Sequence, residues 1–204
     1  MGKVILVAGN SGVGKTTLTA ELCHRASFAT GLEQHTERPF QALMAGNLNR
    51  FALANQVDYL LLRTEQERAI RHQPLTGLID GGLDLDFFGF TRLFRSKGYL
   101  TEAEYALCER LYLSLRDLLG PPDLILYLTA PLAMIERRYA RRGRALEIAR
   151  REDLASMDSL IAEWIDSITD LPVITIDATI ADFGAPAFIA PLLDRIRSAL
   201  KLPA

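Results

Sequence analysis

Cysteine is scarce in this sequence. The 204 residues include two, Cys23 and Cys108, which lie far apart and belong to no C-x-x-C pair. Their number and spacing argue against a disulfide framework and against a cysteine-rich zinc site. We therefore expect two buried or otherwise neutral thiols without a chemical role.

Long apolar runs are missing as well. The longest apolar stretches have the length of a β-strand, which is too short to span a bilayer. The first of them, residues 4–8, leads into a glycine-rich loop and not into the small-residue cleavage site of a signal peptide. We therefore expect no membrane partner and a cytoplasmic location.

Neither sign of charge is in large excess. The sequence has 23 lysines and arginines against 25 aspartates and glutamates, a formal net charge of −2, and its basic residues form no long run. A nucleic-acid-binding protein usually carries a strongly basic face, so we expect no nucleic acid polymer as a partner. A local basic cluster would still suit a small anion. No repeat or linker divides the chain, and its length suits a single domain over residues 1–204.

Short apolar runs alternate with longer helical patterns along the chain. This alternation is typical of βαβ units and predicts an α/β fold with a parallel five-stranded sheet flanked by helices in three layers. Such sheets bind ligands beyond the carboxyl ends of their strands. We predict strands at 3–8, 27–33, 75–80, 123–129 and 172–177, and helices at 15–25, 39–45, 48–71, 87–96, 101–118, 131–141, 148–168 and 186–200. Thr101 and Glu104 have the spacing of a capping box at one helix start.

Residues 9–16 carry the most specific motif of the sequence. They read GNSGVGKT and fit G-x-x-x-x-G-K-[ST] without a mismatch, between a predicted strand and a predicted helix. In such a P-loop the backbone N–H groups form a nest for phosphate, Lys15 reaches the β- and γ-phosphates, and the Thr16 hydroxyl can bind Mg²⁺. The predicted nucleotide-binding set here is Gly9, Asn10, Ser11, Gly12, Val13, Gly14, Lys15, Thr16 and Thr17.

The densest basic cluster lies at residues 137–144, which read RRYARRGR. A cluster of this kind can be the solvated basic end of a helix. In a chain with a P-loop, however, guanidinium groups suit the oxygens of a transferred phosphoryl group, and Gly143 gives the segment a point at which to bend. We predict an Arg-rich lid over residues 137–148.

With this loop and this basic segment at these positions, the chain resembles the deoxynucleoside kinases over nearly its whole length. The resemblance implies a P-loop kinase fold and an enzyme that moves the γ-phosphate of ATP to the 5′-hydroxyl of a deoxynucleoside. It also implies ATP and Mg²⁺ as cofactors, a small-molecule nucleoside substrate, and pairing into a homodimer through long helices.

The resemblance assigns catalytic roles. In the family the second strand ends in a glutamate that acts as general base, and Glu33 takes this position here, with Glu37 as the alternative. Such a carboxylate accepts the hydroxyl proton as the phosphorus arrives. The lid arginines that match those of the family are Arg138, Arg142 and Arg144, of which Arg142 and Arg144, with Lys15, are expected to stabilise the phosphoryl charge, and Arg138 and Arg142 to contact ATP.

A second set of matches implies a deoxynucleoside pocket. Gln56, which offers both a donor and an acceptor, takes the position that reads the base edge. Arg63 matches an arginine that pairs with an aspartate beside the base, here Asp86, and Phe90 matches an aromatic residue that stacks on the base. Glu147 matches an acidic residue that contacts the sugar 3′-hydroxyl.

The remaining matches concern the nucleotide and its metal. Asp182 and Phe183 resemble the segment that borders the adenine of ATP. Asp80 keeps the acidic residue that follows the third strand in the family, and a carboxylate there can help to hold Mg²⁺ through water. Thr16 and Asp80 are therefore the predicted metal-binding residues.

At two positions the sequence departs from the family. Family members have an arginine after the acidic residue of the third strand, whereas this chain reads Asp80-Gly81-Gly82. A tyrosine that touches the sugar is also missing, and Met44-Ala45 occupies its region. Both departures lie on the substrate side. They leave two alternatives open: a P-loop kinase that acts on another small alcohol or on a nucleoside monophosphate, and an ATP-binding regulator or degenerate kinase with little turnover.

Overall fold

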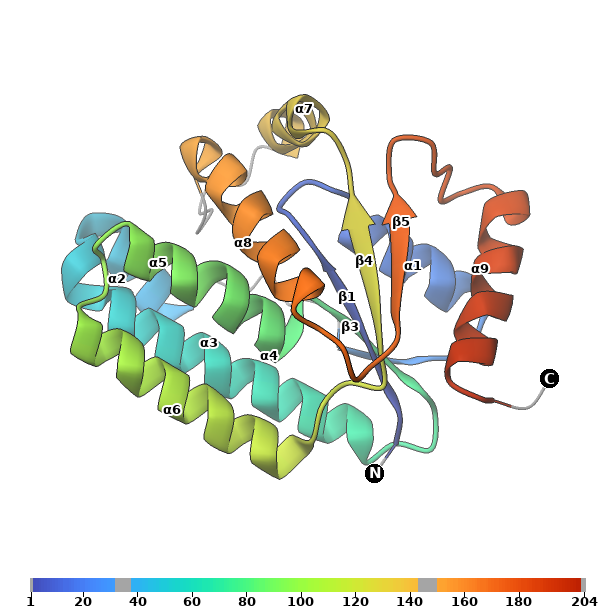
Figure 1. The fold of residues 1–204 in the computed structure, drawn as a ribbon, viewed down its shortest axis with the longest axis horizontal. Coiled ribbons are helices and arrows are strands. Elements are labelled where there is room, and N and C mark those ends of the chain that lie inside the picture. Colours follow the sequence, from blue (N-terminus) through green and yellow to red (C-terminus); the bar gives the residue numbers. More distant parts are fainter. Residues whose placement is uncertain (1, 32–37, 143–149, 203–204) are drawn as a thin grey trace.

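The computed structural model describes residues 2–31, 38–142 and 150–202. Its sheet has five parallel strands in the order β2-β3-β1-β4-β5 (Figure 1). The strands are β1 (Val4–Gly9), β2 (Ala29–Gly31), β3 (Gly77–Asp80), β4 (Leu124–Thr129) and β5 (Val173–Asp177). The predicted α/β fold with a parallel five-stranded sheet is therefore confirmed.

Helices connect the strands and cover the sheet. They are α1 (Lys15–Arg25), α2 (Pro39–Gly46), α3 (Leu48–Arg71), α4 (Gly82–Leu85), the π-helix η1 (Asp86–Thr91), α5 (Arg92–Ser96), α6 (Glu102–Leu119), α7 (Leu132–Arg142), the 3-10 turn η2 (Arg151–Asp153), α8 (Leu154–Asp166) and α9 (Pro186–Ala199). In the described parts of the chain, no helix combines the length and the apolar character needed to cross a membrane.

Both faces of the sheet are covered. Helices α1 and α9 lie on one face, at the right of Figure 1, and α3, α4 and α8 lie on the other. Successive side chains of a strand point to opposite faces, and β1 is buried along its whole length. Ile5 and Val7 pack against the α1–α9 side, whereas Val4 and Leu6 pack with residues of α3, α4 and α8. This arrangement explains why the strands read as continuous apolar runs.

The carboxyl ends of the central strands meet at one edge of the sheet. In the register, Val7 of β1 pairs with Asp80 of β3, and Gly9 of β1 pairs with Leu128 of β4. Residues that follow β1 and β3 are therefore neighbours in space. A ligand site of an open α/β sheet is expected at this edge.

For the helix predicted at 87–96, the predicted first residue is wrong. The chain is helical from Gly82, through α4, the π-helix η1 and α5, as far as Ser96. The two glycines after β3 do not form a loop. Gly81 has φ 87° and ψ −96°, and this left-handed backbone makes a turn sharp enough for a helix to begin at the next residue.

Two other predicted elements have different bounds. The strand predicted at 27–33 is β2, an edge strand that pairs with β3 over Ala29–Gly31, and residues 32–37 lie outside the described residues. The helix predicted at 148–168 is α8, which begins at Leu154 after the turn η2. This turn forms because the Asp153 carboxylate accepts a hydrogen bond from Arg150 N at 2.9 Å.

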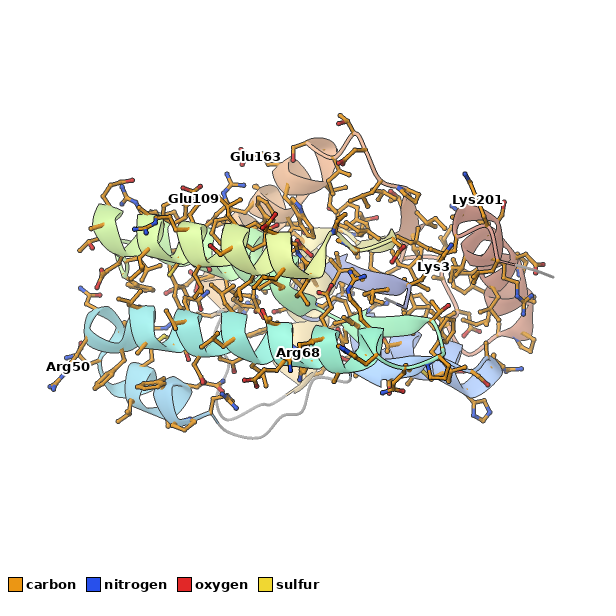
Figure 2. All side chains as sticks on the ribbon, turned by 90° about the horizontal axis from the view of Figure 1, so that it is seen from below. Lys3, Arg50, Arg68, Glu109, Glu163 and Lys201 are labelled. Carbon is orange, nitrogen blue, oxygen red and sulfur yellow. The ribbon has the colours of Figure 1, made fainter. Side chains whose placement is uncertain are left out.

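The long helices α3 and α6 lie side by side (Figure 2). Helix α6 starts with the predicted capping box, in which the Thr101 hydroxyl accepts from Glu104 N and the Glu104 carboxylate accepts from Thr101 N. Cys108 of α6 is a buried free thiol, and its burial raises its pKa to about 11. Cys23 is also a free thiol, and burial raises its pKa as well.

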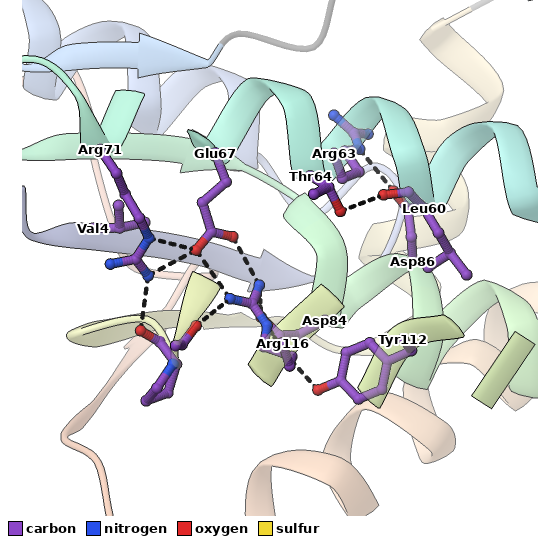
Figure 3. Close-up of polar contacts among 12 residues, drawn as sticks. Val4, Leu60, Arg63, Thr64, Glu67, Arg71, Asp84, Asp86, Tyr112 and Arg116 are labelled. Carbon is purple, nitrogen blue, oxygen red and sulfur yellow. Dashed lines mark hydrogen bonds and ion pairs between the residues drawn. The ribbon is translucent and has the colours of Figure 1, made fainter. Parts of the chain in front are cut away.

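A buried ionic network joins α3, α4 and α6 (Figure 3). Arg116 of α6 lies 2.7 Å from Glu67 of α3 and 3.0 Å from Asp84 of α4. The Tyr112 hydroxyl donates to Asp84 at 2.8 Å, and burial, together with the charge of Asp84, raises the pKa of Tyr112 so that it stays a donor. The network therefore fixes α4, which leads into the π-helix at Asp86, against the two long helices.

Replacing Arg116 with methionine is expected to lower the free energy of unfolding by about 3–5 kcal/mol, because the change leaves the buried Asp84 without its cation, while Glu67 keeps Arg71. Urea denaturation followed by circular dichroism measures this loss. Arg110 is exposed on the same helix, and Arg110→Met is expected to change the free energy by less than about 0.5 kcal/mol. Equal urea midpoints for Arg116→Met and the unchanged protein would contradict the role of the network.

Candidate active site

The P-loop joins the central strand β1 to α1 at the carboxyl edge of the sheet. Helix α1 begins at Lys15, so its unpaired N–H groups and its positive dipole end adjoin the loop. The Lys15 ammonium bends back and donates to Gly9 O at 2.9 Å and to Asn10 O at 3.0 Å. Backbone donors and a cation are thus gathered at one point, as phosphate binding requires.

The side chain of Asn10 ties the P-loop to the helix that follows the basic segment. Asn10 is buried, and its amide nitrogen donates to Leu154 O at 2.7 Å and to Asp158 Oδ1 at 3.2 Å, both on α8. Its amide oxygen accepts from Ser11 N at 2.8 Å. Asn10 therefore contributes to the loop's shape and leaves the phosphate contacts to the backbone.

Helix α7 holds the other side of the P-loop. Arg138 donates to Val13 O at 2.9 Å and to Ala178 O, beyond β5, at 3.1 Å. The helix packs so closely that a Cβ on Gly12, whose φ is 84°, would lie 3.2 Å from Tyr139 N. Arg138, a predicted ATP-binding residue, thus lies at the P-loop with its guanidinium on backbone carbonyls.

The two predicted metal-binding residues are in contact. The Thr16 hydroxyl donates to Asp80 Oδ2 at 2.6 Å, and Asp80 is buried at the end of β3. The described residues contain no group of three or more histidine, cysteine or acidic side chains that could hold a metal. The pair offers one hydroxyl and one carboxylate, which suits an ion that takes its remaining ligands from water and phosphate.

An arginine from another element lies beside Gly81. A Cβ on Gly81 would lie 3.6 Å from Arg63 Nη2 of α3. Arg63 is buried, and its Nε donates to Asp86 Oδ2 at 2.7 Å (Figure 3). A guanidinium is therefore present next to the glycine, although no basic residue is adjacent to it in sequence.

Gln56 of α3 sits in a chain of buried amides and hydroxyls. Its Nε2 donates to the Thr91 hydroxyl at 2.7 Å and to Asp86 O at 3.5 Å, and its Oε1 accepts from Asn55 Nδ2 at 3.4 Å. The Thr91 hydroxyl in turn donates to Asp86 O at 3.0 Å. The structure thus brings together Gln56, Arg63 and Asp86, three of the predicted substrate-binding residues.

Two of the predicted site residues are aromatic, Phe90 and Phe183, and they differ in burial. Phe90 is half-buried and packs beside the core on the α8 side. Phe183 is buried behind the P-loop, where its ring would lie 2.9 Å from a Cβ on Gly14, while Asp182 beside it is exposed. Trp164 belongs to the core. Phe183 therefore supports the loop from the core side.

Several predicted site residues cannot be placed. Glu33, Glu37, Arg144 and Glu147 lie outside the described residues, as does the side chain of Arg142 at the end of α7. Thr17 is exposed on the first turn of α1. The described part of the site therefore consists of the P-loop, the Thr16–Asp80 pair, and the groups around Arg63 and Gln56.

Sequence reasoning missed Asn55, Thr91 and the position of Arg63 beside Gly81. The sequence did contain one signal for the position of Arg63. Gln56 and Arg63 are seven residues apart on a predicted helix, a spacing that places both on one face, toward the end of β3. For Thr91 no such signal existed, because its contact depends on the π-helix.

Comparison with known proteins places the chain among kinases of nucleosides. A family model described as deoxynucleoside kinase matches residues 5–186. A deoxyadenosine/deoxycytidine kinase of Bacillus subtilis (strain 168) is 27% identical over 174 residues, which cover 84% of this chain and 80% of that protein. A deoxyadenosine kinase of Dictyostelium discoideum is 25% identical over 194 residues, which cover 94% of this chain and 78% of that protein.

The fold has close counterparts among solved structures. A deoxyadenosine kinase from M. mycoides with bound dCTP superimposes with a TM-score of 0.80 at 19% identity, covering 96% of this chain and 99% of that one. The same kinase with bound dATP gives a TM-score of 0.79 at 19% identity, covering 95% and 99%. The predicted P-loop kinase fold is therefore confirmed.

Proposed function

Because the chain belongs to the deoxynucleoside kinase family, and is thus a phosphotransferase that moves the γ-phosphate of ATP to a deoxynucleoside, we propose that it prefers deoxyadenosine and deoxycytidine. The observation that carries this proposal is the buried amide of Gln56 beside the Arg63–Asp86 pair. Adenine and cytosine each offer an amino donor next to a ring-nitrogen acceptor, which one amide can match. The name of the Bacillus subtilis relative supports the same two bases.

Lys15 is proposed to act on the transferred phosphoryl group. Its ammonium donates to the carbonyls of Gly9 and Asn10, and phosphate oxygens are proposed to take their place when ATP binds. A cation held in this position stabilises the negative charge that develops in the transition state. The backbone N–H groups of the loop and of the first turn of α1 hold the other phosphate oxygens.

We propose Mg²⁺ as the metal, held by the Thr16 hydroxyl and, through water, by Asp80. Their contact at 2.6 Å and the lack of a three-residue metal cluster in the described chain support an ion shared with phosphates. When bound, the ion neutralises charge on the β- and γ-phosphates. Asp80 keeps the hydroxyl of Thr16 oriented toward this position.

The remaining roles fall on residues that the structure does not describe. We propose that Glu33 accepts the proton of the 5′-hydroxyl, with Glu37 as the alternative base. Arg142 and Arg144 are proposed as the lid cations, and Glu147 as the contact to the 3′-hydroxyl. These assignments rest on the resemblance of the sequence to the family.

Steady-state kinetics test the proposed acceptors. The purified protein is mixed with Mg²⁺-ATP and each of the four deoxynucleosides, ADP release is followed, and the 5′-monophosphate is identified. We expect kcat/KM for deoxyadenosine and deoxycytidine to exceed that for deoxyguanosine and thymidine by at least about tenfold. EDTA should abolish turnover. A preference for deoxyguanosine or thymidine would refute the proposed base selectivity.

Neither alternative that Gly81 left open gains support. The first alternative, another alcohol or a nucleoside monophosphate, followed from the space that the glycines at 81 and 82 open, and the second, a regulator with little turnover, followed from the missing arginine. The family match over residues 5–186 and the deoxynucleoside kinases among the relatives favour an active deoxynucleoside kinase instead.

We also propose that the chain forms a homodimer through α3 and α6. These helices lie side by side and carry the exposed leucines Leu61, Leu107, Leu113 and Leu118 (Figure 2). Covering exposed apolar side chains favours association. Light scattering coupled to size exclusion should give twice the mass of one chain, and a mass equal to one chain at micromolar concentration would refute the dimer.

A further inference from the structure

We propose that Thr91 is a specificity-determining residue that acts by fixing the orientation of the Gln56 amide. This inference rests on the proposed function, in which Gln56 contacts the base of the deoxynucleoside. Thr91 itself is a positioning residue, because its hydroxyl contacts Gln56 and the backbone of Asp86.

The hydroxyl of Thr91 has a defined direction. It donates to Asp86 O at 3.0 Å, so its oxygen lone pairs are left to accept from Gln56 Nε2 at 2.7 Å. At the other end of the amide, Asn55 Nδ2 faces Gln56 Oε1 at 3.4 Å. Thr91 and Asn55 are fully buried, and Gln56 is 1% exposed. Water therefore does not compete for these contacts. The donor end of the Gln56 amide faces Thr91, and its acceptor end faces Asn55.

The π-helix makes this arrangement available. In a π-helix hydrogen bonds run between residues five apart, and Asp86 and Thr91 are the first and last residues of η1. The Thr91 hydroxyl therefore reaches the carbonyl of Asp86, whose side chain pairs with Arg63. The same turn thus orients the Gln56 amide and places Asp86 beside it.

Orientation of the amide decides which bases it can match. An amide offers an acceptor at one end and a donor at the other. Adenine and cytosine present an amino donor beside a ring-nitrogen acceptor, whereas guanine and thymine present a carbonyl acceptor beside a ring N–H donor. Turning the amide by half a turn therefore exchanges one class of base for the other. A fixed Gln56 selects one class, and an unfixed Gln56 accepts both.

Asn55 leaves room for the opposite orientation. Within the described part of the chain, Asn55 Oδ1 is buried without a hydrogen-bond partner. If both amides turned, Asn55 could accept from Gln56, and the Thr91 hydroxyl would donate to Gln56 in place of Asp86 O. The second state would lose the bond from Thr91 to Asp86 O, and it would place Gln56 Oε1 against Asp86 O, to which Gln56 Nε2 now donates at 3.5 Å. Thr91 makes the shorter of the two contacts to Gln56 Nε2, at 2.7 Å, and is therefore the residue to change.

The test is the ratio of kcat/KM for deoxyadenosine and deoxycytidine to that for deoxyguanosine and thymidine. We expect Thr91→Val, which removes the hydroxyl, to lower this ratio by about tenfold, since one buried hydrogen bond is lost. Thr91→Ser should keep the ratio. Because every substrate is measured on the same sample, a lower folded fraction cancels from the ratio.

Thr64→Val is the matched control. It removes a hydroxyl from α3 that donates to Leu60 O at 2.8 Å, without contact to Gln56. It should leave the ratio unchanged. If Thr91→Val does not fold, Asn55→Leu replaces it, because it removes the contact at the other end of the amide and should also lower the ratio.

Two outcomes overturn the inference. One is an unchanged ratio in the folded variant, Thr91→Val or Asn55→Leu, and the other is an equal fall in Thr91→Ser and Thr91→Val. Both are distinct from failure of the proposed function. If the proposed function failed, the unchanged protein itself would phosphorylate none of the four deoxynucleosides, or would prefer deoxyguanosine or thymidine.

Discussion

Lys15→Met is expected to lower kcat/KM for phosphoryl transfer by about a thousandfold or more, because the change removes the cation that we propose to stabilise the transferred group. In the structure the ammonium contacts Gly9 O and Asn10 O, at the loop that would receive the phosphates. Methionine keeps the length of the side chain and removes its charge. Steady-state ADP release with saturating deoxynucleoside measures the effect.

The matched control is Lys201→Met, an exposed lysine after α9 that should leave kcat/KM unchanged. Thermal unfolding adds a second measurement. A ligand that binds the folded state raises the melting temperature, so ATP should stabilise the unchanged protein more than Lys15→Met. If Lys15→Met kept more than about a tenth of the activity, the phosphate role of the loop would have to be abandoned.

Arg63→Gln should lower kcat/KM for the deoxynucleoside by about a hundredfold, comparable to the removal of one transition-state donor. Arg63 is buried beside Gly81 and pairs with Asp86, which is the contact that the family resemblance gives it beside the base. Glutamine keeps a donor but loses the charge. Arg68→Gln, an exposed change on the same helix (Figure 2), is the control and should have no effect.

A double variant separates charge loss at the site from damage to the fold. Arg63→Gln leaves the Asp86 carboxylate without its cation, and a buried unpaired carboxylate is itself destabilising. Arg63→Gln with Asp86→Asn removes both charges. If Arg63 acts on the reaction, activity stays low in the double variant. Recovery to about the level of Asp86→Asn alone would show that Arg63 serves only to neutralise Asp86.

Gly81 is tested with two variants. With φ 87° and ψ −96° it lies outside the left-handed α region, in a conformation that costs other residues about 1–3 kcal/mol, so Gly81→Arg carries backbone strain in addition to its new charge. Gly81→Ala carries the strain without the charge and is the proper reference. Space itself is available, because a Cβ there would have its nearest contact at 3.6 Å.

Local signals in the sequence were enough to predict the sheet and the P-loop. The run at β1 is apolar throughout because both faces of the strand are covered, and the glycine-rich motif follows it directly. The capping box at Thr101 was equally local. Such features depend on a few consecutive residues, so no knowledge of tertiary contacts was needed.

The features that the sequence did not reveal depend on a backbone turn or on distant contacts. The helix that starts at Gly82 follows from the backbone turn at Gly81, and a pair of glycines is compatible with a loop or a turn. The π-helix places Thr91 on Gln56, which is 35 residues away. Arg63 reaches Gly81 through the packing of α3 against β3 and α4. Side-chain partners of this kind follow from the packed structure alone.

The most direct test of the central claim is to follow the products of one reaction by ³¹P NMR. The protein is incubated with Mg²⁺-ATP and deoxyadenosine, and the same mixture without deoxyadenosine is the reference. We expect deoxyadenosine 5′-monophosphate and ADP in equal amounts, and neither product in the reference. ADP with inorganic phosphate in both samples, or unchanged ATP in both, would contradict a kinase that phosphorylates deoxyadenosine.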